Sequence, residues 1–193
     1  LAPLIGMVVG FSVMALVTRL SMRYKVKRNS VIFRRLQLVS AAAYSLGHGT
    51  NDAQKTMGII AVLLFASGYL GDTFYVPFWV IMAAHIAIGL GTLVGGRRVI
   101  KTLGMRVTKL KPIGGFSAET AGAVTLIGTA LGGIPASTTH TITGSIIGVG
   151  ATKRLSSIRW SVARRITWAW VLTIPLSSTI AGLSYLAIKL VFL

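Results

Sequence analysis

The sequence contains no cysteine, few acidic residues and little charge of any kind. The absence of cysteine from its 193 residues excludes a disulfide framework, a thiolate nucleophile and a thiolate metal site. Charged residues make up 12% of the chain, whereas soluble domains carry roughly 25%. This low charge, together with a mean hydropathy of +0.76, argues against a soluble fold and predicts an all-α integral membrane protein.

The charge that is present is mostly basic, with 20 Lys and Arg against 3 Asp and Glu. Such an excess can indicate nucleic-acid binding, but here the bases lie between long apolar runs and form no soluble basic face, so we expect no nucleic-acid partner. Short loops rich in Lys and Arg stay in the cytoplasm, which predicts a multi-pass protein of a cell membrane, in bacteria the inner membrane. Most of the bases fall in three connections, at residues 19–35, 97–111 and 153–165.

Long uncharged runs predict the membrane spans. The uncharged runs at residues 1–18, 74–96 and 166–188 are each long enough for a crossing, which takes about 20 apolar residues, and the last of them predicts a span at residues 166–190. The run at 120–152 is too long for one crossing, so we expect a re-entrant helical hairpin over residues 112–152. Residues 36–71 would extend roughly 54 Å as one helix, more than the core thickness of about 30 Å, and this predicts a broken helix.

The first polar cluster, residues 47–55, lies at that predicted break. Two glycines flank His48, and Thr50 or Asn51 could cap a second half-helix. Asp52 and Lys55 follow three residues apart, on one face of a helix. Charges at membrane depth are costly and usually line a pathway enclosed by protein, so we interpret this cluster as functional.

The second polar cluster, residues 132–140, divides the predicted hairpin. Pro135 is expected to stop the incoming helix and Ser137 to cap the outgoing one. A half-helix N-terminus binds oxyanions, while Asp52 and the Asn51 carbonyl could hold a hard cation. The alternative for residues 137–139 is close helix packing by small side chains.

Three further ionisable residues have weaker signals. Glu119 follows Ser117 at an expected helix start, which favours a capping role over gating. His48 and His140 are expected to orient neighbouring groups, although His140 could carry a proton at neutral pH.

The two polar clusters resemble the paired signatures of inorganic phosphate transporters of the PiT class. Residues 47–55 carry the first as Gly-His-Gly-Thr-Asn-Asp-Ala-Gln-Lys, and residues 135–140 the second as Pro-Ala-Ser-Thr-Thr-His, which residues 144–150 extend. Family members have two inverted halves, each with one copy of each motif. The chain therefore resembles the C-terminal half of a bacterial member, with a connecting span and basic cytoplasmic loop at 1–35 and a transport repeat at 36–193.

The resemblance implies secondary active symport of inorganic phosphate with a proton or sodium ion by alternating access. It implies no enzyme activity, no catalytic residue and no cofactor. The expected partners are the lipid bilayer, the N-terminal half of the same transporter and, in one assembly left open, a second copy in a homodimer. The expected substrate-binding residues are Asn51, Asp52, Ser137, Thr138 and Thr139, with Thr50, Gln54 and Lys55 as second choices, and Asn51 and Asp52 are also the candidates for sodium.

Lys55 departs from the family pattern, since many members have Asn at this position. An Asn carbonyl can coordinate sodium and an ammonium group cannot. We therefore expect Lys55 either to pair with Asp52 or to replace one cation by a fixed charge. Either outcome favours proton coupling or transport of a metal–phosphate complex.

Three other functions compete with symport. An uncoupled anion or cation channel could use the same broken helices. A membrane-embedded hydrolase would draw on His48, Asp52, His140 or Ser145, but the sequence contains neither H-E-x-x-H nor G-x-S-x-G. A purely structural membrane subunit would leave Asp52 and Lys55 unexplained.

Overall fold

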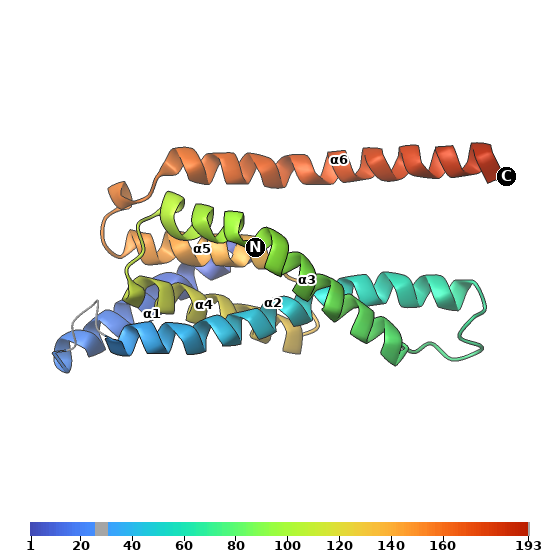
Figure 1. Cartoon of the computed structure of the whole chain (residues 1–193). Helices are drawn as coiled ribbons and strands as arrows, with labels where there is room; N and C mark the ends of the chain where they lie inside the picture. Colours follow the sequence, from blue (N-terminus) through green and yellow to red (C-terminus); the bar gives the residue numbers. More distant parts are fainter. Residues whose placement is uncertain (26–30, 193) are drawn as a thin grey trace. The chain divides into compact units, whose positions relative to one another are not determined.

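The structure, a computed structural model, describes residues 1–25 and 31–192, and only the backbone at 97–100 and 191–192. Every regular element in this part is helical (Figure 1), which confirms the all-α prediction. The predicted loop bases Lys27 and Arg28 lie outside the described residues. The elements are α1 (Ala2–Arg23), α2 (Val31–Ala66), α3 (Phe78–Lys101), the π-helical η1 (Thr102–Val107), α4 (Pro112–Leu131), α5 (Thr138–Ala151), the 3-10 turn η2 (Leu155–Ser157) and α6 (Trp160–Phe192).

The chain forms two compact units, Leu1–Ile158 and Arg159–Leu193. The second unit consists of α6, a long helix with Pro175 in its interior. Proline has no N–H to donate to the preceding turn, and its carbonyl accepts from the hydroxyl of Thr179 at 2.8 Å. The predicted span at residues 166–190 lies within this helix.

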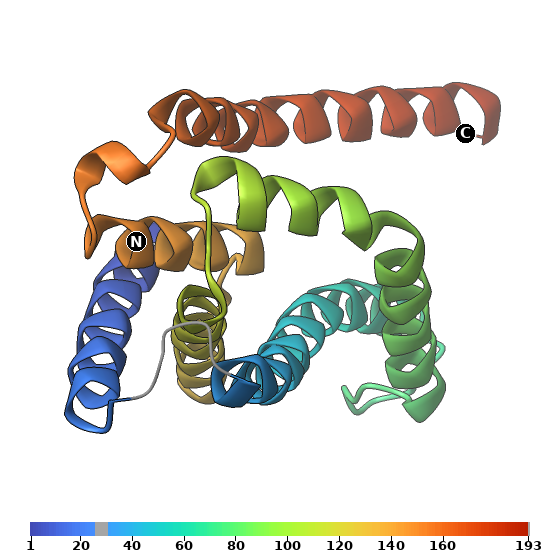
Figure 2. The ribbon, with the colours of Figure 1, turned by 60° about the vertical axis from the view of Figure 1, so that its left-hand side comes forward.

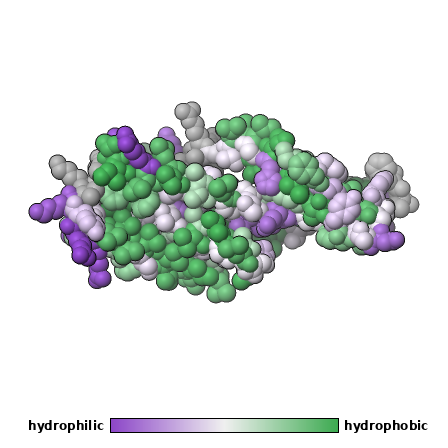
Figure 3. Space-filling model, turned by 90° about the horizontal axis from the view of Figure 1, so that it is seen from below, coloured by the Kyte–Doolittle hydropathy of each residue, from purple (hydrophilic) through white to green (hydrophobic). Residues whose placement is uncertain are grey.

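Three helices of the described chain are long and apolar enough to cross a membrane: Ala2–Arg23, Phe78–Gly96 and Trp160–Leu190. Each of them contains most of one of the three uncharged runs of the sequence. Large apolar side chains on them are exposed, Val94 to 89% and Leu190 to 86%. Figure 3 shows broad apolar surface on the face in view, with hydrophilic side chains gathered most densely at one end. Such a surface is suited to lipid, and the chain is a membrane protein.

The helix ends of the first unit separate the basic and acidic connections. In Figure 1 the C-terminal end of α1, the link from η1 to α4 and the link from α5 to η2 lie at one end of this unit. The connection from α2 to α3, which contains Asp72, lies at the other end. This arrangement, which Figure 2 shows from another side, agrees with the expectation that the basic connections of this unit share the cytoplasmic side.

Helix α2 runs through the predicted break without interruption. The broken helix expected at Gly47 and Gly49 is therefore wrong. The prediction rested on the length of residues 36–71, but a helix longer than the hydrocarbon core can be accommodated by tilting. The helix ends instead at Ala66, and Gly68, two residues later, adopts a left-handed conformation with φ of 78°.

The residues expected to cap a second half-helix have a different role. The Thr50 hydroxyl donates to the Leu46 carbonyl at 2.8 Å, and the Asn51 amide donates to the Gly47 carbonyl at 2.9 Å. Both side chains thus bond to carbonyls one turn earlier in the same helix, a pattern found inside helices. Neither residue is an N-cap.

The two helices of the predicted hairpin, α4 and α5, are joined by a tight turn. The N–H of Ile134 donates to the Thr129 carbonyl at 2.9 Å and that of Gly133 to the Ala130 carbonyl at 3.1 Å. With Gly133 at φ of 67°, these bonds form a Schellman motif. Helix α4 therefore ends before Pro135 is reached, so the prediction that Pro135 stops it is wrong.

Helix α1 packs backbone against backbone on α5, through glycines of α5. A Cβ added to Gly144 would meet the carbonyl of Pro3, and one added to Gly148 would meet that of Met7. Small residues four apart are typical of close contacts between membrane helices. The compact unit therefore includes α1 together with the hairpin, a different grouping from the sequence-based division at residue 35.

The C-terminal half of α2 pairs with α3 through an apolar cluster. Its buried members are Ala53 and Met57 of α2 with Val80 and Ala84 of α3. Ala53 directly follows Asp52 in α2, so one side of the helix is held by α3. The polar face that carries Asp52 is left for the hairpin.

Candidate functional site

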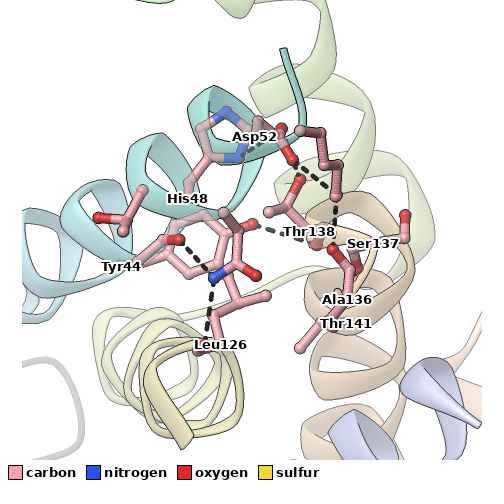
Figure 4. Close-up of polar contacts among 12 residues, drawn as sticks. Tyr44, His48, Asp52, Leu126, Ala136, Ser137, Thr138 and Thr141 are labelled. Atoms are coloured by element: carbon pink, nitrogen blue, oxygen red, sulfur yellow. Dashed lines mark hydrogen bonds and ion pairs between the residues drawn. The ribbon is translucent and has the colours of Figure 1, made fainter. Parts of the chain in front are cut away.

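The turn of the α4–α5 hairpin lies against the middle of α2, and Figure 4 shows the polar side chains that meet there. Three of them, Tyr44, His48 and Asp52, lie one turn apart along α2. Opposite them are Ala136, at the end of the turn, and the first residues of α5. The structure thus brings together the two polar clusters of the sequence, which are more than 80 residues apart.

Asp52 is the centre of this meeting point. Its Oδ2 accepts a hydrogen bond of 3.1 Å from the hydroxyl of Thr138, the first residue of α5. Its Oδ1 lies 3.2 Å from the Nζ of Lys55, and the Nδ1 of His48 lies 3.5 Å from Oδ2. The Asp52 side chain is 34% exposed, so the carboxylate is within reach of a ligand.

Lys55 joins the same two elements. Its Nζ donates to the carbonyl of Ala136 at 2.8 Å and to the Asp52 carboxylate at 3.2 Å. The sequence-based expectation that Lys55 pairs with Asp52 is confirmed. The bond to the hairpin could not be expected from the sequence, because it links residues 81 positions apart.

Asn51 has a structural role that its sequence motif does not reveal. The residue is 3% exposed. Its Nδ2 donates to the Gly47 carbonyl at 2.9 Å and to the Leu126 carbonyl at 3.1 Å. Because both amide protons are used, only the side-chain oxygen is left to act on a ligand, as an acceptor. An acceptor is suited to a cation and not to a phosphate oxygen.

Ser137 caps α5, as the sequence predicts. Its hydroxyl accepts from the backbone N–H of His140 at 3.4 Å, and its carbonyl accepts from the Thr141 hydroxyl at 2.9 Å. The N–H groups of the first helical residues have no carbonyl of the same helix to bond. The start of α5 therefore presents free donors and the positive end of the helix dipole beside Asp52.

Tyr44 was missed by the sequence interpretation. Its hydroxyl donates to the Thr138 carbonyl at 3.3 Å, and its ring stacks on His48 with centroids 6.2 Å apart. A Cβ on Gly122 would come within 2.9 Å of the Tyr44 ring, so the glycine makes room for it. The signal that could have found Tyr44 is its spacing, since Tyr44, His48 and Asp52 lie on one helix face.

The remaining predicted site residues are Thr50, Gln54 and Thr139, and all three are exposed. Thr50 bonds to its own helix. The structure does not place these three side chains in the network around Asp52. Within the described part of the chain, no three His, Cys, Asp or Glu side chains gather as a metal ligand set.

Glu119 forms a second polar contact between α2 and α4. Its carboxylate accepts from the Ser40 hydroxyl at 2.7 Å and from the Gln37 amide at 3.4 Å. Because α4 begins at Pro112, Glu119 lies two turns inside the helix, so the expected capping role is wrong. Gln37 and Ser40 gave no sequence signal, since a polar residue near a basic loop is unremarkable by itself.

The sequence of this chain also matches those of known proteins. Sequences of the phosphate transporter family match residues 1–181. The probable low-affinity inorganic phosphate transporter of Rhizobium meliloti (strain 1021) is 54% identical over 191 residues, which cover 99% of this chain and 57% of the relative. The protein of the same name from Bacillus subtilis (strain 168) is 39% identical over 192 residues, which cover 100% of this chain and 58% of the relative.

Sodium-dependent relatives are more distant. The sodium-dependent phosphate transporter 1-B of Danio rerio is 36% identical over 155 residues, which cover 79% of this chain and 23% of the relative. A solved structure described as the sodium-dependent phosphate transporter matches with a TM-score of 0.73 and 29% identity, over 83% of this chain and 41% of that one. The chain spans about half the length of the bacterial relatives it matches.

These findings confirm the resemblance to phosphate transporters and the helical fold that it implies. The matched relatives are named as transporters and not as enzymes. The family's sequences align along residues 1–181, and a 54% identical relative covers nearly the whole chain. The protein belongs to the phosphate transporter family.

Proposed function

We propose that this chain is the C-terminal half of a symporter that moves inorganic phosphate across the cell membrane together with a cation, a proton or a sodium ion. The observation that carries the proposal is the contact between Asp52 of α2 and Thr138 of the hairpin. It places an acidic group, an ammonium group and a helix N-terminus at one point of a membrane protein. A phosphate ion and a cation can both find partners there.

Phosphate would bind at the start of α5. The first N–H groups of a helix and its dipole favour an oxyanion, and the Lys55 ammonium adds a full positive charge beside them. The hydroxyl groups of Ser137 and Thr139 lie on the same turn. Asp52 and the Asn51 side-chain oxygen supply acceptors on the cation side. Thr50 and Gln54, exposed on α2, would contact substrate only along its path to this point.

The position at which the hairpin turn meets α2, far from the end of that helix, supports transport by alternating access. Its turn contacts α2 at residues 44–55, and α2 continues to Ala66, about 16 Å further at 1.5 Å per residue. We infer a re-entrant hairpin whose tip stays within the membrane. A matching N-terminal half of inverted topology would complete the site and move against this one, and a homodimer of such transporters is compatible with the apolar surface.

The test is uptake of radiolabelled phosphate into proteoliposomes that contain this chain joined to its N-terminal half. Sodium and proton gradients are applied separately, and Asp52→Asn serves as the variant. We expect uptake that follows a cation gradient and is lost in the variant, because neutralising Asp52 leaves the Lys55 ammonium without its counter-ion.

Three other results would contradict the proposal. Phosphate flux that is independent of every cation gradient indicates a channel. Absence of phosphate flux, with the protein correctly inserted, indicates a different substrate. A variant that transports like the unmodified protein would remove Asp52 from the site.

A further inference from the structure

The contacts of Lys55 have the composition of a cation site. The group at their centre is an ammonium, and its two partners are a carboxylate oxygen of Asp52 at 3.2 Å and the backbone carbonyl of Ala136 at 2.8 Å. Carboxylate and backbone carbonyl oxygens are the ligands that hard metal cations prefer. The two partners come from α2 and from the hairpin turn, so a cation between them joins the two elements.

The Ala136 carbonyl is available because of its place in the chain. It precedes Ser137, the N-cap of α5, whose carbonyl accepts the first bond of that helix, from the N–H of Thr141 at 3.0 Å. Ala136 therefore lies outside the helix, and its carbonyl points to the Lys55 ammonium. The lysine reaches it from α2 across the gap between the two elements.

The ammonium also leaves little need for a second cation. Asp52 is a single negative charge, and Lys55 compensates it by direct contact. The other groups around the carboxylate are the Thr138 hydroxyl at 3.1 Å and the His48 ring nitrogen at 3.5 Å. A sodium ion on Asp52 would be repelled by the ammonium beside it, because a like charge at short distance disfavours the bound state.

We infer that Lys55 is a tethered cation that takes, in this half of the protein, the place of a mobile sodium ion. The inference rests on the proposed function and specifies its ion coupling. Some relatives are named as sodium-dependent phosphate transporters. In this protein the hairpin and α2 are held together at Asp52 by a charge that never leaves. Phosphate uptake is then independent of sodium at this point, and removal of the ammonium makes it sodium-dependent.

The experiment uses the transporter with both halves in proteoliposomes and compares phosphate uptake in sodium with uptake in choline. The variants are Lys55→Asn, which supplies a carbonyl oxygen, Lys55→Met, which removes the charge from a side chain of similar length, and Lys55→Arg, which keeps it. Lys109→Met is the matched control, an exposed lysine in the connection between α3 and α4.

We expect Lys55→Arg and Lys109→Met to show the same ratio of uptake in sodium to uptake in choline as the unmodified protein. Lys55→Asn and Lys55→Met should lose uptake several-fold in choline and recover it in sodium, with Asn recovering more completely. Lys55→Asn and Lys55→Met variants whose ratio stays that of the unmodified protein would overturn the inference.

A second measurement decides the matter for variants that do not transport. The thermal midpoint of unfolding in detergent is measured with and without sodium, since an ion that binds the folded state raises it. A sodium-induced increase that is larger in Lys55→Asn than in the unmodified protein supports the inference, and equal increases contradict it. This result does not depend on phosphate transport, so failure of the proposed function would be recognised separately, as absence of uptake by the unmodified protein in both media.

Discussion

The hydroxyl of Thr138 donates to the Asp52 carboxylate at 3.1 Å, and this bond connects the first residue of α5 to the middle of α2. The two residues are separated by 86 positions in the sequence. Thr138 is 3% exposed, so water cannot readily replace the hydroxyl. The bond determines how closely the hairpin start approaches the acidic side chain.

Substitution of Thr138 should therefore weaken transport when it removes the hydroxyl group, and much less when it changes only the size of the side chain. Thr138→Val keeps the shape and removes the donor, at a cost of about 1.5–3 kcal/mol for a bond to a charged group. We expect phosphate uptake to fall roughly tenfold or more. Thr138→Ser keeps the donor and should retain most activity. A larger loss in Thr138→Ser than in Thr138→Val would show that the methyl group, and not the bond, is what matters.

Replacement of Asn51 should destabilise the fold before it affects any ligand. Asn51→Asp removes both donors and places a buried carboxylate against the carbonyl oxygens of Gly47 and Leu126, where it has no donor; a buried polar group without a partner costs about 1–3 kcal/mol, and more when it is charged. We expect a lower thermal midpoint of unfolding in detergent. The control is Gln54→Glu, the same amide-to-acid change on an exposed neighbour, which should leave the midpoint close to that of the unmodified protein. A stable Asn51→Asp would argue against the two hydrogen bonds of the Asn51 amide.

The packing of α1 on α5 should tolerate no side chain at Gly148. Gly148→Ala places a Cβ against the Met7 carbonyl, and such overpacking typically costs about 1–3 kcal/mol. Gly182→Ala is the matched control, because a Cβ there has nothing within 4 Å. Thermal unfolding in detergent should separate the two variants, with Gly148→Ala the less stable. Equal midpoints would mean that α1 is not seated on α5 in the membrane protein.

The hairpin turn offers a test in which the two variants are adjacent. Gly133 has φ of 67°, a conformation that costs a residue with a Cβ roughly 1–2 kcal/mol. Gly132 has φ of −81°, which any residue adopts. We expect Gly133→Ala to lower both thermal stability and phosphate uptake, since the turn positions Ala136 and Thr138. Gly132→Ala should do neither, and the reverse order of effects would refute the Schellman geometry.

The contact of Glu119 with Ser40 should appear as an energetic coupling between α2 and α4. The hydroxyl and carboxylate are 2.7 Å apart, and interhelical hydrogen bonds in membrane proteins average about 0.6 kcal/mol. Ser40→Ala and Glu119→Gln should each reduce thermal stability, and the double variant should lose less than the sum. Strictly additive losses would indicate that the two residues act independently.

The features of this chain that follow from its sequence are those set by neighbouring residues. The confirmed Ser137 cap depends on a side chain and a backbone N–H three residues away. The pairing of Asp52 with Lys55 depends on spacing within one helix turn. The predicted break at Gly47 did not follow in the same way, because glycines permit a kink without requiring one. Helix α2 stays continuous there, with bonds such as that of Thr50 to Leu46 along its length.

The partners of the missed residues cannot be identified from spacing along α2. Tyr44, Ser40 and Gln37 gain their roles from partners in the hairpin, 79 to 94 positions away. The role of a polar side chain on a membrane helix cannot be assigned until the surface that faces it is known. Only the packing of α4 and α5 on α2 supplies that surface.

The sequence by itself determined the helical class, the uncharged runs that become membrane helices and the two polar motifs that mark the family, because each depends on neighbouring residues and on the cost of charge in lipid. The tertiary structure alone decided which of the motif residues meet. It directed the Asn51 amide protons to backbone carbonyls, left Gln54 and Thr139 exposed, and brought the Lys55 ammonium to the carbonyl of Ala136. These are contacts between distant segments, and their geometry is set by how closely whole helices approach.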